Sequence, residues 1–300
     1  MKWIEISVRV DREAAEAVYE FFNRVYRQAD GATSTVVEAD GYNSRGELVD
    51  TSVLVKLYVP VDSRLDEVKR RIEEGLWHLS QISPSISEPT FRELTQDDWA
   101  HAWREHFHPQ RIGSRLVIKP SWRAWPAAPD DVVIELDPGM AFGTGLHPST
   151  RLCLILLERY LQPGMRVLDQ GSGSGILSLA AAKLGAAYVH ARDIDPVAVQ
   201  ATRENAERNH LADRIQVTQG SLPPEEEFDL ILCNILADTI IHLLRLGMVT
   251  RLAPGGVLIA SGIIETQQDH VKEVMELRGL RIVERLSESD WVALVARLPG

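Results

Sequence analysis

The sequence predicts an α/β fold: a seven-stranded Rossmann-like sheet with an antiparallel terminal hairpin, plus a small N-terminal ferredoxin-like α+β domain. From residue 148 onward, apolar strand patterns alternate with helical patterns, which is typical of a parallel sheet with right-handed crossovers. The last two strand patterns are joined only by "SESD" (287–290), too short for a parallel crossover, so they must pair antiparallel. Before residue 93 the order strand, helix, strand, strand, helix, strand favours a split βαβ arrangement.

Hydrophobic periodicity defines the elements of the N-terminal domain, for which we take residues 1–93. They are, in order, a strand over 3–10, a helix over 12–28, strands near 33–38 and 51–59, a helix over 64–80 and a strand near 87–93. None of these elements carries a catalytic pattern. We therefore expect this domain to recognise a substrate, with scaffolding as the alternative.

A connecting segment, residues 94–120, follows. The stretch "DDWAHAWREHFHP" predicts a helix with one aromatic face, made of Trp99, Trp103 and Phe107, which favours packing over ligand binding. Three histidines lie nearby, but without cysteines or an HExxH pattern they predict no metal site.

The second domain, residues 121–300, contains the alternating pattern. After two strands in "RLVIKPSW" and "DVVIEL", the expected strands are 165–169, 187–193, 215–219, 229–233 and 256–261, and the helices are 175–184, 196–209, 236–250 and 265–277. The hairpin "LRIVERL" and "WVALVARL" completes seven strands in the main sheet.

Composition narrows the function class. The chain has 300 residues and a formal net charge of −11, which argues against broad nucleic-acid binding because that needs a basic surface. No apolar run approaches the roughly 20 residues that cross a bilayer, and the opening "MKWIEISVRV" predicts a strand rather than a secretory signal. With only two cysteines, Cys153 and Cys233, a disulfide framework is not expected. We expect a cytoplasmic protein with no membrane partner and no direct nucleic-acid partner.

A glycine loop, "VLDQGSGSGILSLA", places Gly171, Gly173 and Gly175 between a strand and a helix. Such glycines let a backbone approach a ligand, and the following helix N-terminus offers N–H groups and a positive dipole end. A dinucleotide fingerprint would need glycine at position 176, where Ile176 stands. Together with the terminal hairpin, this favours S-adenosylmethionine over the dinucleotide of an NAD dehydrogenase. A tight turn without a ligand is the other alternative.

Two polar residues follow strands of the same sheet. Asp193 lies 22 residues beyond Gly171, near the spacing of an acid that binds ribose hydroxyls. Asp195 is the alternative, although Pro196 behind it favours a helix cap. Asn234 ends the fourth strand, where ligands of open α/β sheets bind, and its side-chain oxygen can accept from an amine. A cap for the next helix is the other reading of Asn234.

A glycine-rich stretch, "DPGMAFGTGLHPSTRLCL" (137–154), precedes the sheet. This stretch is long and rich in glycine, which is hard to explain by packing alone. We expect a lid on the cofactor that includes Gly143, with Phe142 as its apolar cover. Ser149 and Thr150 then place hydroxyl groups at a helix start.

Together these stretches resemble the PrmA family, the bacterial methyltransferases of ribosomal protein L-eleven (L11), over nearly the whole chain. The specific marks are "DPGMAFGTGLHPST" and "NILA", which occur in the family's order and spacing. The resemblance implies a class I methyltransferase sheet, S-adenosylmethionine as methyl donor, and an N-terminal domain that binds the large-subunit ribosomal protein. The implied reaction is N-methylation of lysine side chains and of the N-terminal α-amine.

The resemblance also implies site residues. By matching motif positions, cofactor contacts are expected at Thr150, Gly171, Asp193 and Asn234, and Asn234 would border the acceptor amine as the catalytic residue. The loop and the lid add Gly173, Gly175, Phe142 and Gly143 to the expected cofactor site.

The sequence departs from the family pattern at Gln170, Ser172 and Arg192, and Arg192 would compete for the ribose if it paired with Asp193. Two alternatives to L11 methylation stay open. One is a methyltransferase of another protein or of a small amine, and the other is a non-catalytic S-adenosylmethionine-binding module.

Overall fold

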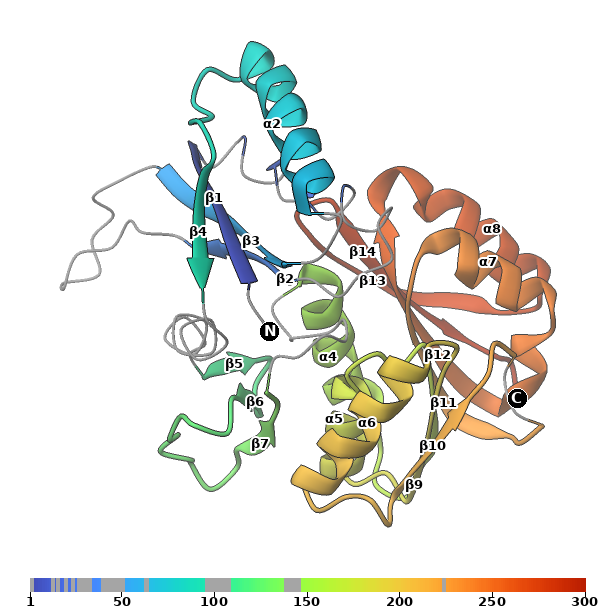
Figure 1. Cartoon of the computed structure of the whole chain (residues 1–300). Coiled ribbons are helices and arrows are strands. Elements are labelled where there is room, and N and C mark those ends of the chain that lie inside the picture. The colour runs from blue at the N-terminus through green and yellow to red at the C-terminus, as the bar shows by residue number, and fades with distance from the viewer. Residues whose placement is uncertain are drawn as a thin grey trace. The chain divides into compact units, whose positions relative to one another are not determined.

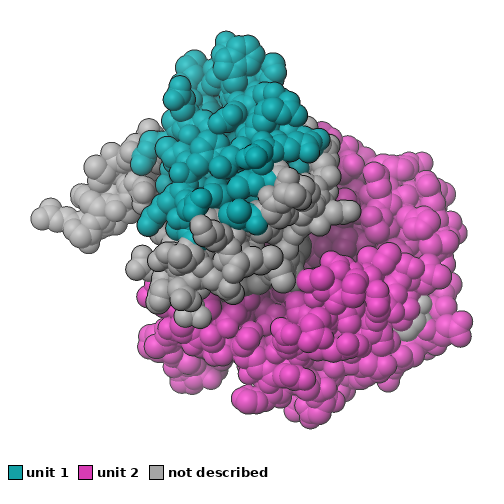
Figure 2. Space-filling view, viewed as in Figure 1, with its two compact units in different colours: residues 1–107 teal, residues 108–300 magenta. Residues whose placement is uncertain are grey.

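The computed structural model describes residues 3–11, 14, 17–18, 21–22, 25, 34–38, 52–61, 65–94, 109–137, 147–222 and 225–300. The chain divides into two compact units, residues 1–107 and 108–300 (Figure 2). The three-part division expected from the sequence stays a prediction. The expected helix over "DDWAHAWREHFHP" lies outside the described residues except for Pro109, and the lid residues Phe142 and Gly143 lie outside them entirely.

The first unit contains a four-stranded antiparallel sheet in the order β2-β3-β1-β4. Its elements are β1 (Trp3–Asp11), β2 (Ser34–Glu38), β3 (Ser52–Pro60), α2 (Leu65–Ile82) and β4 (Thr90–Leu94). Alternate residues of β1, such as Ile6 and Val8, share one core with Val18 and Phe22, which are helical, and with Ile72 of α2. The period-two and helical patterns therefore meet on the same face of the sheet.

The second unit contains a mixed seven-stranded sheet in the order β10-β9-β8-β11-β12-β14-β13 (Figure 1). Its strands are β8 (Arg166–Gln170), β9 (Tyr188–Asp193), β10 (Ile215–Gln219), β11 (Phe228–Asn234), β12 (Leu252–Ile264), β13 (Arg281–Glu288) and β14 (Trp291–Arg297). The strands from β8 to β12 pair in parallel, whereas β14 pairs antiparallel with both β12 and β13. The α/β class with a seven-stranded sheet is confirmed.

Helices cover both faces of this sheet (Figure 1). One face packs against α4 (Pro148–Tyr160), α5 (Ile176–Lys183) and α6 (Pro196–Arg208), and the other against α7 (Ala237–Arg245) and α8 (Gln268–Leu277). Seven of the eight residues of α5 are buried, which is typical of a helix enclosed on all sides. It lies between the main sheet and a small sheet of β5 (Gln110–Ile112), β6 (Leu116–Lys119) and β7 (Val132–Glu135).

Three elements differ from the sequence expectations. The helix expected over 236–250 stops at Arg245, because Gly247 adopts a left-handed backbone with φ 96° and a 3₁₀ turn, Met248–Arg251, follows. Strand β12 is longer than the expected 256–261, and the three-residue β5 was not expected. Among the described residues, no helix has both the length and the apolar character needed to cross a membrane.

Candidate functional site

The candidate site lies at the carboxyl ends of β8, β9 and β11 and at the first turn of α4. Parallel strands end at a common edge of the sheet, where open α/β folds bind their ligands. A Cβ added to Gly171 after β8 would lie 2.4 Å from Cγ2 of Ile235, which follows Asn234 after β11. The glycine loop and the segment that carries Asn234 are therefore in direct contact.

The three loop glycines all adopt left-handed backbone conformations. The φ angles are 81° at Gly171, 55° at Gly173 and 80° at Gly175, a region that side chains with a Cβ rarely occupy. A Cβ at Gly175 would lie 2.8 Å from Cγ2 of Thr202. We expected a ligand to be the reason for these glycines. At Gly171 and Gly175 the structure gives a different immediate reason, which is backbone conformation combined with contact from protein side chains.

Helix α6 fixes the loop from the side. The Thr202 hydroxyl donates to the carbonyl of Gly173 at 3.0 Å, and the Asn205 amide donates to the carbonyl of Ser174 at 2.9 Å. Both α6 side chains are buried. Helix α5 then begins with Gly175 as its N-cap and no side-chain cap. The first-turn N–H groups of α5 are therefore left uncapped by side chains at the site, a chemistry that suits a carboxylate.

Asp193 is oriented by two backbone donors. Its Oδ2 accepts from the N–H of Gly173 at 2.9 Å, and its Oδ1 accepts from the N–H of Asp195 at 3.0 Å. Each carboxylate oxygen keeps acceptor capacity for a further donor, which is what two neighbouring ribose hydroxyls need. Asp195 itself accepts from the N–H of Val197 at 2.8 Å and caps α6, as expected from the sequence.

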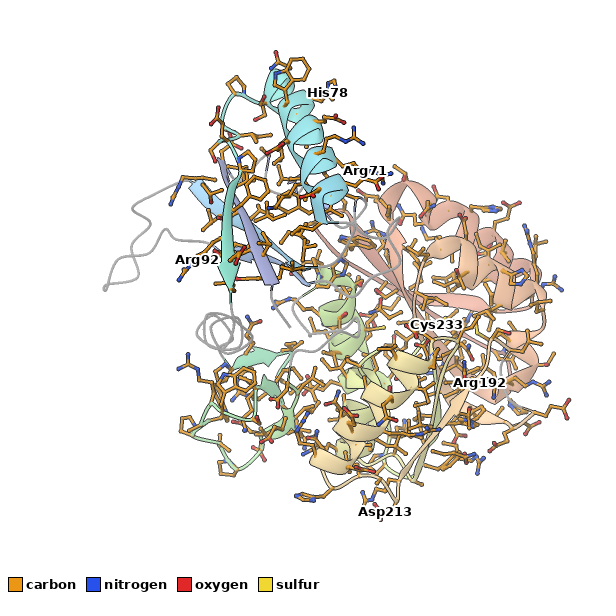
Figure 3. The ribbon with its side chains drawn as sticks, viewed as in Figure 1. Arg71, His78, Arg92, Arg192, Asp213 and Cys233 are labelled. Carbon is orange, nitrogen blue, oxygen red and sulfur yellow. The ribbon has the colours of Figure 1, made fainter. Side chains whose placement is uncertain are left out.

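Arg192 does not pair with Asp193 in the part of the chain that the structure describes. The two are successive residues of β9, so their side chains leave opposite faces of the strand. The Arg192 guanidinium donates to the Thr218 hydroxyl at 3.3 Å and lies over Gly220, where an added Cβ would meet it (Figure 3). The competition for the ribose considered from the sequence is absent from this arrangement.

Thr150 and Asn234 form the acceptor side of the site. The Asn234 amide nitrogen donates to the Thr150 hydroxyl at 3.1 Å, joining β11 to the first turn of α4. The Asn234 oxygen Oδ1 is buried and has no hydrogen-bond partner among the described residues. The cap of α7 is Leu236, so the reading of Asn234 as a helix cap is wrong. A buried acceptor without a donor is costly, and it suits a ligand that brings one.

A buried carboxyl lies beneath the glycine loop. Asp169 is fully buried on β8, and its Oδ2 accepts from the Ser178 hydroxyl of α5 at 2.6 Å. Its Oδ1 has no partner among the described residues. Burial raises the pKa of Asp169 to about 6, assisted by the charge of Asp193 and opposed by the Ser178 hydrogen bond. The sequence analysis assigned this acid no role, although an acid that ends an apolar strand before the loop was the available signal.

The two cysteines lie inside the unit that holds the site. Cys153 of α4 and Cys233 of β11, the latter labelled in Figure 3, are both fully buried and not bonded to each other. Burial raises the pKa of both thiols, and the charge of Asp169 adds to that shift. Both therefore stay protonated and act as small apolar side chains.

Comparisons with known proteins agree on one family. The family profile "Ribosomal protein L11 methyltransferase (PrmA)" matches residues 2–299. A ribosomal protein L11 methyltransferase of Chloroflexus aurantiacus is 43% identical over 326 residues, covering 99% of this chain and 98% of that protein. That of Bacillus subtilis is 40% identical over 316 residues, covering 99% of this chain and 100% of the relative.

A solved structure extends the comparison to the fold. The ribosomal protein L11 methylase of Lactobacillus delbrueckii subsp. bulgaricus superposes with a TM-score of 0.61 at 33% sequence identity. The match covers 65% of this chain and 100% of that chain. The mixed α/β sheet described above is thus shared with a chain of similar sequence.

Proposed function

Because the chain belongs to the PrmA family of ribosomal protein L11 methyltransferases, we propose that it transfers methyl groups from S-adenosylmethionine to amines of ribosomal protein L11. The acceptors in this proposal are lysine side chains and the N-terminal α-amine. The resemblance expected from the "DPGMAFGTGLHPST" and "NILA" motifs is confirmed by the match over 2–299. The observation that carries the site assignment is the Thr150–Asn234 pair, because it leaves a buried oxygen acceptor beside the glycine loop.

The chain's own groups fit S-adenosylmethionine. Asp193 would accept the two ribose hydroxyls, since its oxygens are already held in place by backbone N–H groups. The loop of Gly171, Gly173 and Gly175 and the uncapped start of α5 would hold the methionine portion and its carboxylate. The Thr150 hydroxyl is already bonded to Asn234, so we propose that it contributes mainly through that residue. Phe142 and Gly143 remain the proposed cover.

The chemistry needs a neutral amine. When bound, S-adenosylmethionine supplies an electrophilic methyl group on a positively charged sulfur. A lysine amine has a pKa near 10.4, so its deprotonation at neutral pH costs about 4 kcal/mol, and an α-amine near 8 costs roughly 1 kcal/mol. Asn234 Oδ1 would accept a hydrogen bond from the neutral amine and orient its lone pair, while water takes the proton. Alignment of this kind supplies much of the rate enhancement.

We further propose that the first unit is a ferredoxin-like domain that holds the substrate protein. The strand order β2-β3-β1-β4, all antiparallel, supports this, as does a core shared by α2 and the helical residues around Phe22. In the second unit, β14 and β13 provide the antiparallel ending of a class I methyltransferase sheet. Two buried unpaired thiols suit a reducing compartment, which supports a cytoplasmic location.

The test is a methylation assay on Asn234→Ala. Purified L11 is incubated with the full-length chain and S-adenosylmethionine, and methylated amines are counted by mass spectrometry. Losing the amine acceptor is expected to lower kcat about 100-fold, as for other single groups that stabilise a transition state. The matched control is Asn209→Ala, a buried asparagine that bonds the backbone of Glu135 and should affect stability without lowering kcat.

Four outcomes separate the alternatives. Methylated L11 from the wild type and loss of product from Asn234→Ala support the proposal. Product on other proteins or on small amines but not on L11 would overturn the substrate. Calorimetric binding of S-adenosylmethionine without product on any amine would instead indicate a binding module, and an Asn234→Ala variant with wild-type turnover would overturn the role of Asn234.

A further inference from the structure

Two successive residues of β12 lie next to both members of the Thr150–Asn234 pair. In the parallel register of β11 and β12, Asn234 is the Cα partner of Ser261. The Ser261 hydroxyl is buried and donates to the carbonyl of Ser149 at 2.9 Å, and Ser149 directly precedes Thr150. Strands β11 and β12 therefore each bond the first turn of α4 through one side chain, at the same level of the sheet.

The next residue, Gly262, supports the other side of the pair. Its φ is 80°, and a Cβ added there would lie 2.4 Å from the carbonyl oxygen of Ile235, the residue after Asn234. The pairing of β12 with β14 shifts register between Ala260 and Ile263, around this glycine. The β12 backbone approaches Ile235 closely here, so the peptide after Asn234 has little room to move.

These contacts hold the Asn234 side chain in place. With α4 held by Ser261, the Thr150 hydroxyl stays beside the Asn234 side chain and accepts a hydrogen bond from its amide nitrogen. In this arrangement Oδ1 is the Asn234 atom that has no partner among the described residues. Side-chain hydrogen bonds of this kind fix the orientation of a functional group, which is worth more to the reaction rate than to stability.

We propose that Ser261 and Gly262 are positioning residues for methyl transfer: Ser261 fastens α4 and Gly262 supports Ile235, and together they hold the Asn234 oxygen toward the acceptor amine. This rests on the proposed role of Asn234. Neither residue touches the reacting atoms in this proposal. Loss of either should lower kcat while the KM values for S-adenosylmethionine and L11 stay near those of the wild type.

The experiment compares Ser261→Ala with Ser261→Cys. Alanine removes the donor and leaves a small gap, whereas cysteine fills the volume of serine but is a weak donor. We expect kcat to fall about 10- to 100-fold in Ser261→Ala, with KM changed less than about twofold, because misplacing a reacting group by about 1 Å costs up to this much. Ser261→Cys should recover stability but regain only part of kcat. Full recovery of kcat by cysteine would show that packing alone matters and would overturn the proposal.

A control on the same strand separates stability from positioning. Leu258 is a buried residue of β12 that packs in the cluster with α7 and α8, on the face away from α4. Leu258→Val should lower the melting temperature and keep kcat within about twofold, because core loss away from the site acts on folding. If Leu258→Val lowers kcat as much as Ser261→Ala, the effect belongs to the strand as a whole and the proposal fails.

A double-mutant cycle tests whether Ser261 acts through the pair. Thr150→Val removes the acceptor of the Asn234 amide at nearly constant volume. If Ser261 works by holding Thr150 in place, Ser261→Ala should add less than about threefold to the kcat loss of Thr150→Val. Fully multiplicative losses would overturn the coupling.

Asn234→Ala, run alongside, keeps the two proposals apart: an active Asn234→Ala refutes the proposed site, whereas an inactive one beside a fully active Ser261→Ala refutes only this inference. Gly262→Ala should also lower kcat, and an unchanged kcat in that variant would remove Gly262 from the proposal.

Discussion

The two halves of the candidate site are held together in different ways. In the cofactor half, formed by the glycine loop and Asp193, side chains bond the loop backbone over 20 to 31 positions: Asp193 accepts from the N–H of Gly173, and Thr202 and Asn205 donate to loop carbonyls. The acceptor half is fixed by hydrogen bonds from side chains to residues far apart in sequence: Asn234 and Thr150 are 84 positions apart, and Ser261 and Ser149 are 112. The cofactor half is therefore sensitive to changes in the loop backbone and in the few nearby side chains that bond it. The acceptor half depends on side chains that the fold brings together from distant parts of the sequence.

The largest expected effect is at Asp169, whose buried side chain accepts from Ser178 beneath the glycine loop of the cofactor half. Its pKa is raised from 3.8 to about 6, so the folded state binds a proton that the unfolded state has already lost in this range. Wild-type stability should therefore fall as pH rises through about 4 to 6, and a shift of about 2 units corresponds to about 3 kcal/mol. Asp169→Asn keeps an acceptor for Ser178 and does not titrate.

The measurement is urea unfolding of both proteins from pH 4 to pH 8 without cofactor. Across this range the free energy of unfolding of the variant should rise by about 3 kcal/mol relative to that of the wild type, with most of the change complete near pH 7. Because the variant lacks only the Asp169 carboxyl, the difference between the two proteins reports Asp169 together with the charges that it interacts with. If the unfolding free energies of the two proteins change with pH in parallel, burial of the ionised Asp169 carboxylate does not destabilise the fold.

The second prediction concerns the side chain that the backbone of the cofactor half orients. Asp193→Ala should weaken binding of S-adenosylmethionine about 10- to 100-fold, because hydrogen bonds to a charged group contribute about 1.5 to 3 kcal/mol. Calorimetric titration measures it. Asp195→Ala is the matched control: it removes the α6 cap and should cost about 1 kcal/mol of stability with affinity unchanged. Equal losses of affinity in both variants would assign the effect to the loop rather than to the ribose contact.

The third prediction tests whether the two halves are mechanically linked. Gly171→Ala and Gly164→Ala place alanine at similar left-handed positions, with φ 81° and 91°, and this backbone strain alone should cost each about 1 to 2 kcal/mol. An added Cβ meets nothing within 4 Å at Gly164 but lies 2.4 Å from Ile235 at Gly171. Only Gly171→Ala should therefore also lower kcat, about threefold to tenfold, by shifting the segment that carries Asn234. A methylation assay at saturating substrate compares them, and equal kcat values would mean that the contact transmits nothing.

The same contrast explains what the sequence could predict. The parallel strands, the glycine loop and the Asp195 cap were predictable because each depends on residues within a few positions of one another. The end of α7 was missed because apolar residues continue past Arg245, although Gly247 carried the stop signal.

The acceptor half was predictable only in part. Asn234 was found from its place at the end of a strand, and its bond to Thr150 required the fold. Ser261 carried no local signal, since a serine inside an apolar strand has many structural uses. Its significance comes from the register that places it beside Asn234 and under Ser149.

The smallest expected effect is at Arg192, the departure from the family pattern that lies next to Asp193 in sequence. Arg192→Leu should change the affinity for S-adenosylmethionine by less than about threefold, well under 1 kcal/mol, because its guanidinium bonds Thr218 on the opposite face of β9. Calorimetry at low salt is the sensitive measurement, since a charge effect on Asp193 would be least screened there. If Arg192 does restrain the Asp193 carboxylate, its removal would strengthen binding about tenfold at low salt and less at high salt. That result would contradict the geometry of β9, and it would add Arg192 to the side chains that hold the cofactor half.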